Sequence, residues 1–505
     1  MRKIAWLIVV LTMAMPGLAL SEEPVYFADP NLQAAVEEEL GISSPTPTDM
    51  LYLTELKANK KGIVDLTGLG FAMNLAKLEL SNNQISDISV LSGLTNLKEL
   101  SLSYNKIRDI SALSGLTNLT SLWLNGHQIS NISMLSGLTN LTSLMLTSKN
   151  IHDISVLSEL TNLTDLSVCG TQASDYSAVS ELTNLTRLWL NGNEISEIPE
   201  LSRLTNLRML SLCYNRISDI SALSNSTNLE SLLLERNQIS DISALSYLTN
   251  LKNLWLQHNQ ISDISALSGL TSLRYLLLDC NHIIGIPLLS GLPNLTMLLL
   301  NNNQVSDISG ISGIISLTEL QLDHNQIRDI SGLSGLTNLR SLRLCNNQIS
   351  DISAFSGLMN LKELFLYNNQ ICDISSISGL MKLTRLNLQK NQISDISAIA
   401  GLESLEYLGL LDNPLNTPAY YIYLPLISSF NPKLTSLTYD PSLNLLTDDW
   451  GVELPNFIEF VNHFGESGCG VQNDWCDYTD LNQSGSVDED DFAKLLEYYF
   501  KGTER

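Results

Sequence analysis

Near the C-terminus, side chains that carry oxygen recur at the spacing that one calcium ion requires. They lie between Asp480 and Phe492, where Gly485 permits the sharp turn in the middle of a twelve-residue loop. The candidate ligands, with Ser486 contributing its backbone carbonyl, are Asp480, Asn482, Ser484, Ser486, Asp488 and Asp491. Because Ca²⁺ takes about six to eight oxygens, this spacing predicts a calcium site, and the alternative is an acidic surface turn.

A second segment, 35 residues earlier, has the same layout but lacks ligands. Leu445 stands where Asp480 supplies the first ligand, and Trp450 stands where the turn needs glycine. Each loop leads into an apolar stretch that predicts a helix, FIEFVNHF and FAKLLEYYF. Such tandem loop–helix units resemble a dockerin or a related EF-hand pair, which implies attachment to a cohesin-like or cell-surface scaffold. Cys469 and Cys476 lie between the units, and in an exported protein we expect them to form a disulfide.

A repeat of 22 residues dominates the rest of the chain. From Leu53 to Leu405 a leucine recurs at every 22nd position, which gives 17 copies over residues 53–426. With that leucine as position 1, leucine also occupies positions 4 and 6, asparagine 9, isoleucine 11 and 14, and aspartate 13. This is the pattern of the leucine-rich repeat. It predicts short parallel strands with positions 4 and 6 inward, and 3₁₀ turns and extended pieces on the opposite, convex side.

Position 9 is asparagine in 13 of the 17 copies. Its amide can hydrogen-bond backbone groups of neighbouring turns that the interior would otherwise leave unsatisfied. The departures are Lys61, His127, Lys149 and Thr171. The last three fall in consecutive repeats, which predicts a locally weaker ladder over residues 127–171.

Positions 3, 5 and 7 should point outward, into the hollow of a horseshoe. The three tryptophans of the array all occupy position 5, three repeats apart, which predicts about 14 Å between neighbours at the ~4.8 Å strand spacing. Large apolar side chains together on an exported protein indicate a binding surface, whereas the alternative is that they only cover the sheet. The ligand would be a protein or a glycan. The predicted ligand-binding residues are Trp123, Met145, Trp189, Leu233, Trp255, Leu277 and Phe365.

The sequence offers little evidence for a catalytic site. His258 and Cys280 share position 8 in adjacent repeats with Asp279 beside them, the proximity that a Cys–His dyad needs. An open sheet, however, provides neither an oxyanion hole nor a cleft that excludes water, so we predict no enzymatic activity. Cys169 and Cys213 share a column two repeats apart, about 10 Å, which is beyond disulfide reach. We therefore expect the solenoid cysteines to be free thiols.

The composition limits the kinds of partner that the protein can bind, and the N-terminus indicates where the protein is located. The chain has 505 residues and a formal net charge of −25, which disfavours nucleic acid and anionic membranes as partners. Arg2 and Lys3 precede an apolar run, residues 4–15, and small residues follow up to Ser21. This layout predicts a signal peptide over residues 1–21, a secreted protein, and no membrane span in the mature chain.

Both ends of the array need covering, because a bare terminal repeat would expose core leucines. Residues 22–52 would form an N-terminal cap, with an amphipathic helix from Asn31 to Leu40. At the other end, the tyrosine-rich segment from Pro418 to Ile427 and a strand within residues 427–440 would form the C-terminal cap. Residues 441–505 would hold the dockerin-like EF-hand pair.

The repeat signature N-Q-I-S-D-I-S-x-L-S-G-L-T-N-L resembles the internalin class of bacterial leucine-rich-repeat proteins, and the segment from Phe27 to Gly41 looks like the helical cap of such arrays. The resemblance implies an α/β leucine-rich-repeat solenoid that binds partners on its concave face and is not an enzyme. We expect a secreted binding protein, with a small helical calcium-binding module for anchoring or recruitment. The alternative is a dockerin-bearing component of an extracellular polysaccharide-degrading assembly.

The calcium loop generates the first prediction. Residues 441–505 should bind one Ca²⁺ and gain stability from it, because an ion that binds only the folded form favours folding by mass action. Changing Asp480 to Ala should abolish this gain, since it removes the first ligand and a charge. Calorimetric titration decides the matter, and either two equal sites or none would contradict one intact and one decayed loop.

Overall fold

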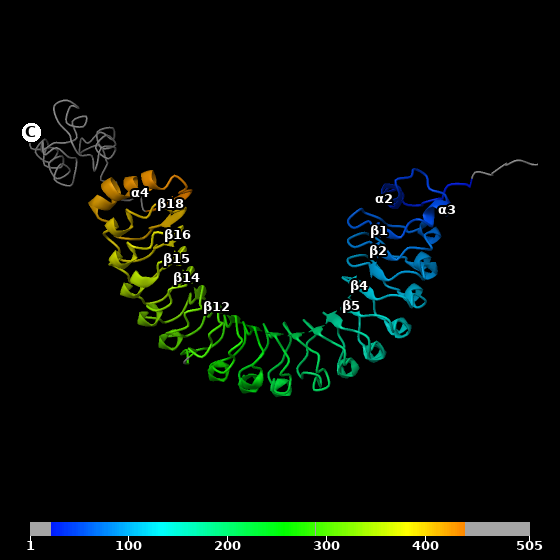
Figure 1. Cartoon of the computed structure of the whole chain (residues 1–505), viewed down its shortest axis with the longest axis horizontal. Helices are drawn as coiled ribbons and strands as arrows, with labels where there is room; N and C mark the ends of the chain where they lie inside the picture. The colour runs from blue at the N-terminus through cyan, green and yellow to red at the C-terminus, as the bar shows by residue number, and fades with distance from the viewer. Residues whose placement is uncertain (1–21, 288, 440–505) are drawn as a thin grey trace, which may run out of the picture. The chain divides into compact units, whose positions relative to one another are not determined.

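The structure, a computed structural model, describes residues 22–287 and 289–439 (Figure 1). The predicted signal peptide, the calcium loop with its decayed copy, and Cys469 with Cys476 all lie outside the described residues. The chain divides into two compact units, whose described parts are residues 22–229 and 230–439. In each unit the strands line one side and the short helices lie on the other (Figure 1).

The first unit begins with two helices and continues as a series of strands, most of them followed by a 3₁₀ helix. The helices are α2 (Pro30–Leu40) and α3 (Pro47–Met50). The strands are β1 (Glu55–Lys57), β2 (Lys77–Glu79), β3 (Glu99–Ser101), β4 (Ser121–Asn125), β5 (Ser143–Thr147), β6 (Asp165–Cys169), β7 (Arg187–Trp189) and β8 (Met209–Ser211). The 3₁₀ helices are η1 (Leu69–Phe71), η2 (Ser89–Gly93), η3 (Ser111–Leu113), η4 (Ser133–Gly137), η5 (Ser155–Glu159), η6 (Ser177–Glu181) and η7 (Ser221–Leu223).

The second unit continues the same alternation and ends in a π-helix, an α-helix and a strand. Its strands are β9 (Ser231–Leu233), β10 (Asn253–Trp255), β11 (Tyr275–Leu277), β12 (Met297–Leu299), β13 (Glu319–Gln321), β14 (Ser341–Arg343), β15 (Glu363–Phe365), β16 (Arg385–Asn387), β17 (Tyr407–Gly409) and β18 (Ser436–Thr438). Its helices are η8 (Ser243–Tyr247), η9 (Ser265–Leu267), η10 (Ser309–Ile311), η11 (Ser331–Leu333), η12 (Ser353–Gly357), η13 (Ser375–Ile377), η14 (Ser397–Ile399), the π-helix η15 (Ala419–Tyr423) and α4 (Leu424–Phe430).

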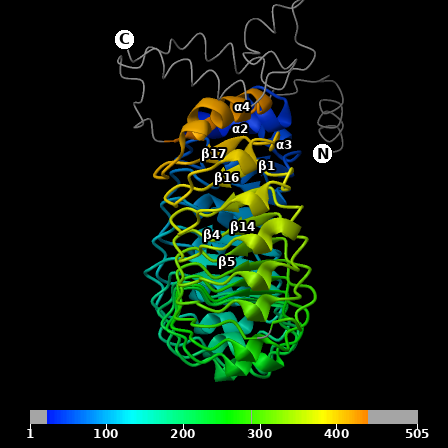
Figure 2. The ribbon, with the colours of Figure 1, turned by 90° about the vertical axis from the view of Figure 1, so that its left-hand side faces the viewer.

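Within each unit, neighbouring strands pair in parallel, and most pairs join residues 22 apart in the sequence. Leu78 pairs with Leu100 in the first unit, and Leu342 pairs with Leu364 in the second. Figure 2 shows β16 and β17 as neighbouring parallel strands, with β14 two strands before β16. The strict repeat length keeps every side chain in a column of its own kind, so identical residues stack along the unit.

The core is a stack of leucines and isoleucines, as the repeat predicts. The leucine at the centre of each three-residue repeat strand from β1 to β17 is buried, while the residues beside it are mostly half exposed. One turn contributes seven fully buried side chains: Leu97, Leu100, Leu102, Ile107, Ile110, Leu113 and Leu116. Each such side chain stabilises the fold by about 1.5–3 kcal/mol relative to exposure, so every rung strengthens its neighbours.

The asparagine at position 9 bridges two successive turns. The Asn83 amide donates to the carbonyls of Ala58 (2.8 Å) and Leu80 (2.9 Å), and its oxygen accepts the N–H groups of Lys61 and Ile63. The same arrangement recurs at the position-9 asparagines of both units, for example at Asn391. One buried side chain therefore satisfies backbone groups that neither turn can satisfy alone.

The 3₁₀ turns start with an aspartate at position 13 that accepts the N–H two residues later. Asp153 accepts from Ser155 at 2.8 Å, and this bond is the main reason why the pKa of Asp153 lies below its ordinary value. Pro199 and Pro287 occupy the serine position in two repeats and have no N–H to donate. No 3₁₀ helix follows β7 or β11 among the described residues of those two repeats.

The expectation of a weaker ladder over residues 127–171 is wrong for the sheet. The asparagine bridge is indeed missing there, yet β4, β5 and β6 are the longest strands of the unit and pair over five residues each. Thr171 donates both its N–H and its hydroxyl to Asn193 Oδ1 instead. His127 is buried, and neither of its ring nitrogens has a hydrogen-bond partner among the described residues.

The predicted helix at the N-terminus and the predicted strand at the C-terminal end are both present as α2 and β18. Asp29 caps α2 through the N–H of Asn31, and its other oxygen accepts the N–H of Val64 at 2.6 Å, which ties the helix to the first repeat. At the other end, Asn431 accepts the N–H of Leu405 and donates to the carbonyl of Leu402. These contacts cover the end of each unit with groups that hydrogen-bond the terminal turn.

His127 generates a stability prediction. The change His127→Asn should restore the bridge and raise the free energy of unfolding by about 1–3 kcal/mol, the usual cost of unmade buried hydrogen bonds. Burial lowers the pKa of His127, so the wild-type protein should lose stability as the pH falls through the unfolded histidine value of about 6.5. Denaturant melts between pH 5 and pH 8 measure both effects.

The His127→Asn variant should not show the loss of stability that the histidine causes in that pH range. His152, which is exposed, provides the matched control, and His152→Asn should leave the stability unchanged. Equal behaviour of the two variants would contradict the account of a buried, unpartnered ring.

Candidate functional site

The exposed face of the sheet is the candidate site in each unit. The strands lie on the inner, concave side and the 3₁₀ helices on the outer side (Figure 1). Side chains at positions 3 and 5 of each strand flank the buried leucine and face outward, as the burial of Ser121, Leu122 and Trp123 illustrates. The face is therefore built from the positions that the core does not constrain.

In the first unit, position 5 carries the apolar column that the sequence predicts. Trp123 lies in register with Met145 on the next strand, and Trp189 lies between Ser167 and Ser211. The two rings are three strands apart, which corresponds to about 14 Å. Trp123, Met145 and Trp189 are all half-buried, so each presents part of its apolar surface to solvent.

In the second unit, the same column begins with four large apolar residues in succession. Leu233, Trp255, Leu277 and Leu299 occupy the same position on β9, β10, β11 and β12 and are all half-buried. Phe365 follows three strands later, on β15. Trp189 and Trp255 belong to different units, so their predicted spacing stays a prediction.

Position 8 forms a rim along the sheet with a left-handed backbone in most repeats. Tyr104 and Tyr214 have φ values of 58° and 59°, and their side chains are 59% and 55% exposed. Gly126, one repeat after Tyr104, has no room for a side chain, since its Cβ would lie 2.7 Å from the tyrosine ring. A bulky residue in this backbone region costs on the order of 1 kcal/mol or more, a cost found most often at functional sites.

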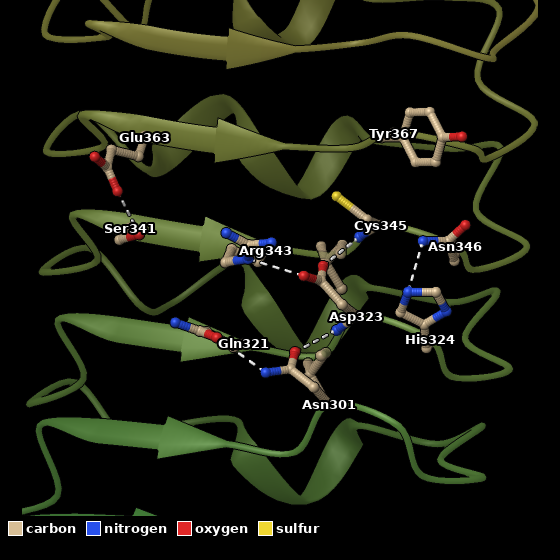
Figure 3. Close-up of polar contacts among 12 residues, drawn as sticks. Asn301, Gln321, Asp323, His324, Ser341, Arg343, Cys345, Asn346, Glu363 and Tyr367 are labelled. Atoms are coloured by element: carbon tan, nitrogen blue, oxygen red, sulfur yellow. Dashed lines mark hydrogen bonds and ion pairs between the residues drawn. The ribbon is translucent and has the colours of Figure 1, made fainter. Parts of the chain in front are cut away.

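A polar ladder runs along position 7 of the second unit (Figure 3). Asp279 accepts the N–H of Asn301, Asn301 accepts the N–H of Asp323, and Asp323 accepts the N–H of Cys345, at 2.8, 2.8 and 2.7 Å. Each side chain thus holds the backbone of the next repeat. Cys345 is buried beside this ladder, and burial raises the pKa of its thiol to about 12, which keeps it protonated.

Arginine and aromatic side chains stack across β14 to β17. Arg343 donates from Nε to Asp323 at 2.8 Å, and its guanidinium carbon lies 5.0 Å from the centre of the Phe365 ring. Arg385 lies 5.8 Å from the same ring and 5.9 Å from the Tyr407 ring. Lys390 lies 5.3 Å from the ring of Tyr367. We call Arg343, Phe365, Tyr367, Arg385, Lys390 and Tyr407 the basic–aromatic patch.

Sequence reasoning identified Phe365 but missed both the polar ladder and the patch. The signal for the ladder was a run of small polar residues at position 7 in successive repeats, which a search for apolar columns ignores. The patch combines positions 3, 5, 7 and 8, so no single column reveals it.

The Cys–His pair does not have the properties of a nucleophile and base. Burial raises the pKa of the Cys280 thiol, and the neighbouring charge of Asp279 raises it further. A nucleophilic cysteine needs the opposite shift, because the thiolate is the reactive form. The five cysteines of the described chain, Cys169, Cys213, Cys280, Cys345 and Cys372, are free thiols.

A pocket of about 680 Å³ lies in the first unit, where the 3₁₀ helix after β7 is missing. Its lining includes His152, Tyr176, Glu197, Pro199 and Glu200. Within residues 22–287 and 289–439, no three histidine, cysteine, aspartate or glutamate side chains are grouped so that they could hold a metal ion. None of the helices in the described part of the chain is long and apolar enough to span a membrane.

Family comparison agrees with this architecture. A profile described as Leucine Rich repeats (2 copies) matches residues 73–115, 95–137, 183–225, 227–269, 271–313, 293–335, 315–357 and 337–379. A single-repeat profile matches residues 379–400, and together the matches cover more than half of the chain. The chain belongs to the leucine-rich-repeat family. A search of curated proteins returned no match.

Solved structures place these leucine-rich repeats near the internalins. An internalin, InlF of Listeria monocytogenes, is 34% identical, with a TM-score of 0.54 over 75% of this chain and 100% of that one. A leucine-rich-repeat protein of Leptospira interrogans is 26% identical, with a TM-score of 0.63 over 78% and 97%. The plant peptide hormone receptor RGFR1, in complex with RGF2, is 25% identical, with a TM-score of 0.60 over 72% and 63%. The chain is therefore an internalin-like leucine-rich-repeat protein.

The polar ladder generates a pH-dependent prediction. Burial raises the pKa of Asp279 in the folded protein, so ionisation of this carboxyl opposes folding. The change Asp279→Asn keeps an oxygen that can accept the Asn301 N–H, as Asn301 itself does for Asp323. The variant should be more stable at neutral pH, on the order of 1 kcal/mol.

The gain of Asp279→Asn should disappear as the pH falls through the raised pKa of Asp279 towards its unfolded value of about 3.9, because the wild-type side chain is then neutral too. Thermal melts of both proteins between pH 3.5 and pH 8 measure the difference. Asp351 is an exposed control, since the N–H of Ser353 holds its pKa below the ordinary value and Asp351→Asn should destabilise at neutral pH. A gain at Asp279 that does not depend on pH would exclude the carboxyl charge as its cause.

Proposed function

We propose that this chain is a secreted, non-enzymatic binding protein that holds a protein ligand against the concave face of its leucine-rich repeats. The observation that carries the proposal is the run of large apolar side chains at position 5. Trp123, Met145 and Trp189 in one unit, and Leu233, Trp255 and Leu277 in the other, are half-buried on the open sheet. Contiguous apolar surface of this kind marks interaction sites, and tryptophan is among the favoured anchors.

The rim supports the same proposal. Tyr104 projects from a strained left-handed backbone and is more than half exposed, although glycine or asparagine would fit that backbone more easily. Tyrosine combines a large contact area with a hydroxyl group, which suits the edge of a protein interface.

The solved structures support a protein ligand. The chain resembles the internalins, the class of InlF, and this resemblance implies a partner on the concave face. RGFR1 is a peptide hormone receptor whose structure is in complex with RGF2. The N-terminal segment from Arg2 to Ser21 supports secretion. A glycan is the alternative ligand, since tryptophan rings also stack on the faces of sugars.

The C-terminal segment supports a second role, in anchoring or recruitment. The ligand spacing from Asp480 to Asp491 favours one bound Ca²⁺, and the tandem layout favours a dockerin-like module. Such a module would attach the chain to a cohesin-like or cell-surface scaffold, with a place in an extracellular polysaccharide-degrading assembly as the alternative function. The defective first loop favours anchoring over cohesin binding.

The experiment first isolates a partner by pull-down of extracellular proteins with the purified chain, and then measures its affinity for variants. Changing Trp189 to Ala should weaken binding by at least about tenfold, because burying one such ring at an interface contributes ~2 kcal/mol or more. The thermal midpoint should stay nearly unchanged, since the ring faces the open side of the sheet.

The matched control is the neighbouring residue Leu190, which is fully buried. Leu190→Ala should lower the free energy of unfolding by about 2–5 kcal/mol. If Trp189→Ala changes neither stability nor the binding of a verified partner, the apolar column only covers the sheet and the proposed site is wrong.

A further inference from the structure

The second unit carries three cationic side chains close together, although the protein as a whole is acidic. On β14 to β16 and the residues that follow them, the outward positions 3, 5, 7 and 8 include the cationic Arg343, Arg385 and Lys390 and only one acidic residue, Glu363. The whole chain has a net charge of −25. Glu319 and Asp323 border this surface on one side and Asp412 on the other, so its selectivity depends on how the guanidinium groups are arranged and not on a net positive charge.

The two arginines are held in place before any ligand arrives. Arg343 on β14 and Arg385 on β16 both stack on Phe365, which lies on the strand between them. Asp323, whose side chain is only 9% exposed, accepts one hydrogen bond from Nε of Arg343. Stacking and pairing fix the guanidinium groups, so binding loses less side-chain entropy than it would with free arginines.

Both guanidinium groups keep donors available for a ligand. Among the described residues, Arg343 uses Nε alone, and the side chain of Arg385 makes no hydrogen bond or ion pair. Glu363, the acidic residue on β15, accepts a hydrogen bond from Ser341 at 3.0 Å (Figure 3). A guanidinium group presents a planar fork that matches a carboxylate, which makes carboxylates the ligand groups that these arginines fit best.

Cationic side chains lie over the aromatic rings of the patch, which leaves less ring surface on which a sugar could stack. Phe365 has a guanidinium group over it from each neighbouring strand, Tyr407 has Arg385, and Tyr367 has Lys390. A sugar needs an uncovered ring face, whereas a peptide can reach the cationic groups with its acidic side chains. The patch therefore differs in chemistry from the tryptophan column.

We propose that the basic–aromatic patch binds an acidic peptide segment of the protein ligand, with one carboxylate at Arg343 and a second at Arg385. The inference rests on the proposed protein-binding function and names the chemistry of the partner. The guanidinium carbons lie 5.0 and 5.8 Å from one ring centre, so they are no more than about 11 Å apart. In a polyproline II segment, residues three apart lie on the same side at a separation of about 9.3 Å, which fits this spacing.

The test uses the full chain and a fluorescent peptide of four Glu-Pro-Pro triplets, with a Gln-Pro-Pro peptide as the neutral control. Anisotropy titration should give saturable binding of the glutamate peptide, no binding of the glutamine peptide, and an affinity that falls as salt is added. Absence of binding by the glutamate peptide would overturn the proposal.

The deciding variant is Arg385→Gln, which removes an exposed guanidinium group that makes no hydrogen bond within the described chain, and should leave the thermal midpoint unchanged. The variant should bind the glutamate peptide with an affinity at least about tenfold lower, which is the usual loss when a hydrogen bond to a charged group is removed. Arg328→Gln is the matched control, because Arg328 is exposed, lies at position 12 and hydrogen-bonds the side chain of Gln348. Equal losses in the two variants would indicate non-specific charge attraction and would refute the site.

Two further outcomes separate this inference from the function on which it rests. If Trp189→Ala abolishes binding of a purified partner while Arg385→Gln alters neither partner nor peptide binding, the function stands and the patch is wrong. If an acidic polysaccharide binds in an Arg385-dependent manner and the glutamate peptide does not, the patch recognises a glycan and the peptide proposal fails.

Discussion

The interior of this protein depends on one hydrogen-bonded contact that recurs along both units. The position-9 asparagine donates to carbonyls of its own turn and of the turn before it, and its oxygen accepts N–H groups of the earlier turn. A turn of 22 residues has too little regular structure to satisfy its own backbone, so each turn needs its neighbour. Where the asparagine is present, it must meet the same backbone groups of the turn before it, and a constant repeat length of 22 residues from Leu53 to Leu405 meets that requirement.

This constraint divides the residues of each repeat into two groups. The buried leucines, the isoleucines and the asparagine are fixed by packing and hydrogen bonding, and they scarcely vary. The outward positions are not constrained by packing in the core, and they differ from repeat to repeat. Position 5, for example, holds Trp123, Ser167 and Arg343 in three different repeats. Function can therefore change along the face without a cost to the core. His127 shows the converse, since a departure at a core position leaves a buried ring without a partner among the described residues.

The exposed faces of the two units differ in chemistry. The first unit presents tryptophan, methionine and tyrosine, whereas the second changes from apolar side chains to the polar ladder and the basic–aromatic patch. Single contacts of the same kind occur in the first unit at Asn59 and Asn191, whereas in the second unit they follow one another through Asp279, Asn301 and Asp323. The ladder also orients Arg343, because Asp323 holds the backbone of the next repeat with one oxygen and the guanidinium group with the other.

The sequence by itself determined the repeat, the buried columns, the asparagine bridge and the outward direction of Trp123 and Trp189. These follow from two strict periods, 2 along a strand and 22 along the chain, and neither requires knowledge of a neighbour's conformation. The calcium loop is a prediction of the same kind, and it lies outside the described residues. Only the tertiary structure decided which outward side chains meet. The lengthening of β4 to β6, the ladder through Asp279 and the stacking of Arg343 and Arg385 on Phe365 depend on side-chain conformations on adjacent strands, and residues that lie 20 or 22 apart in the sequence come together only when the strands pair.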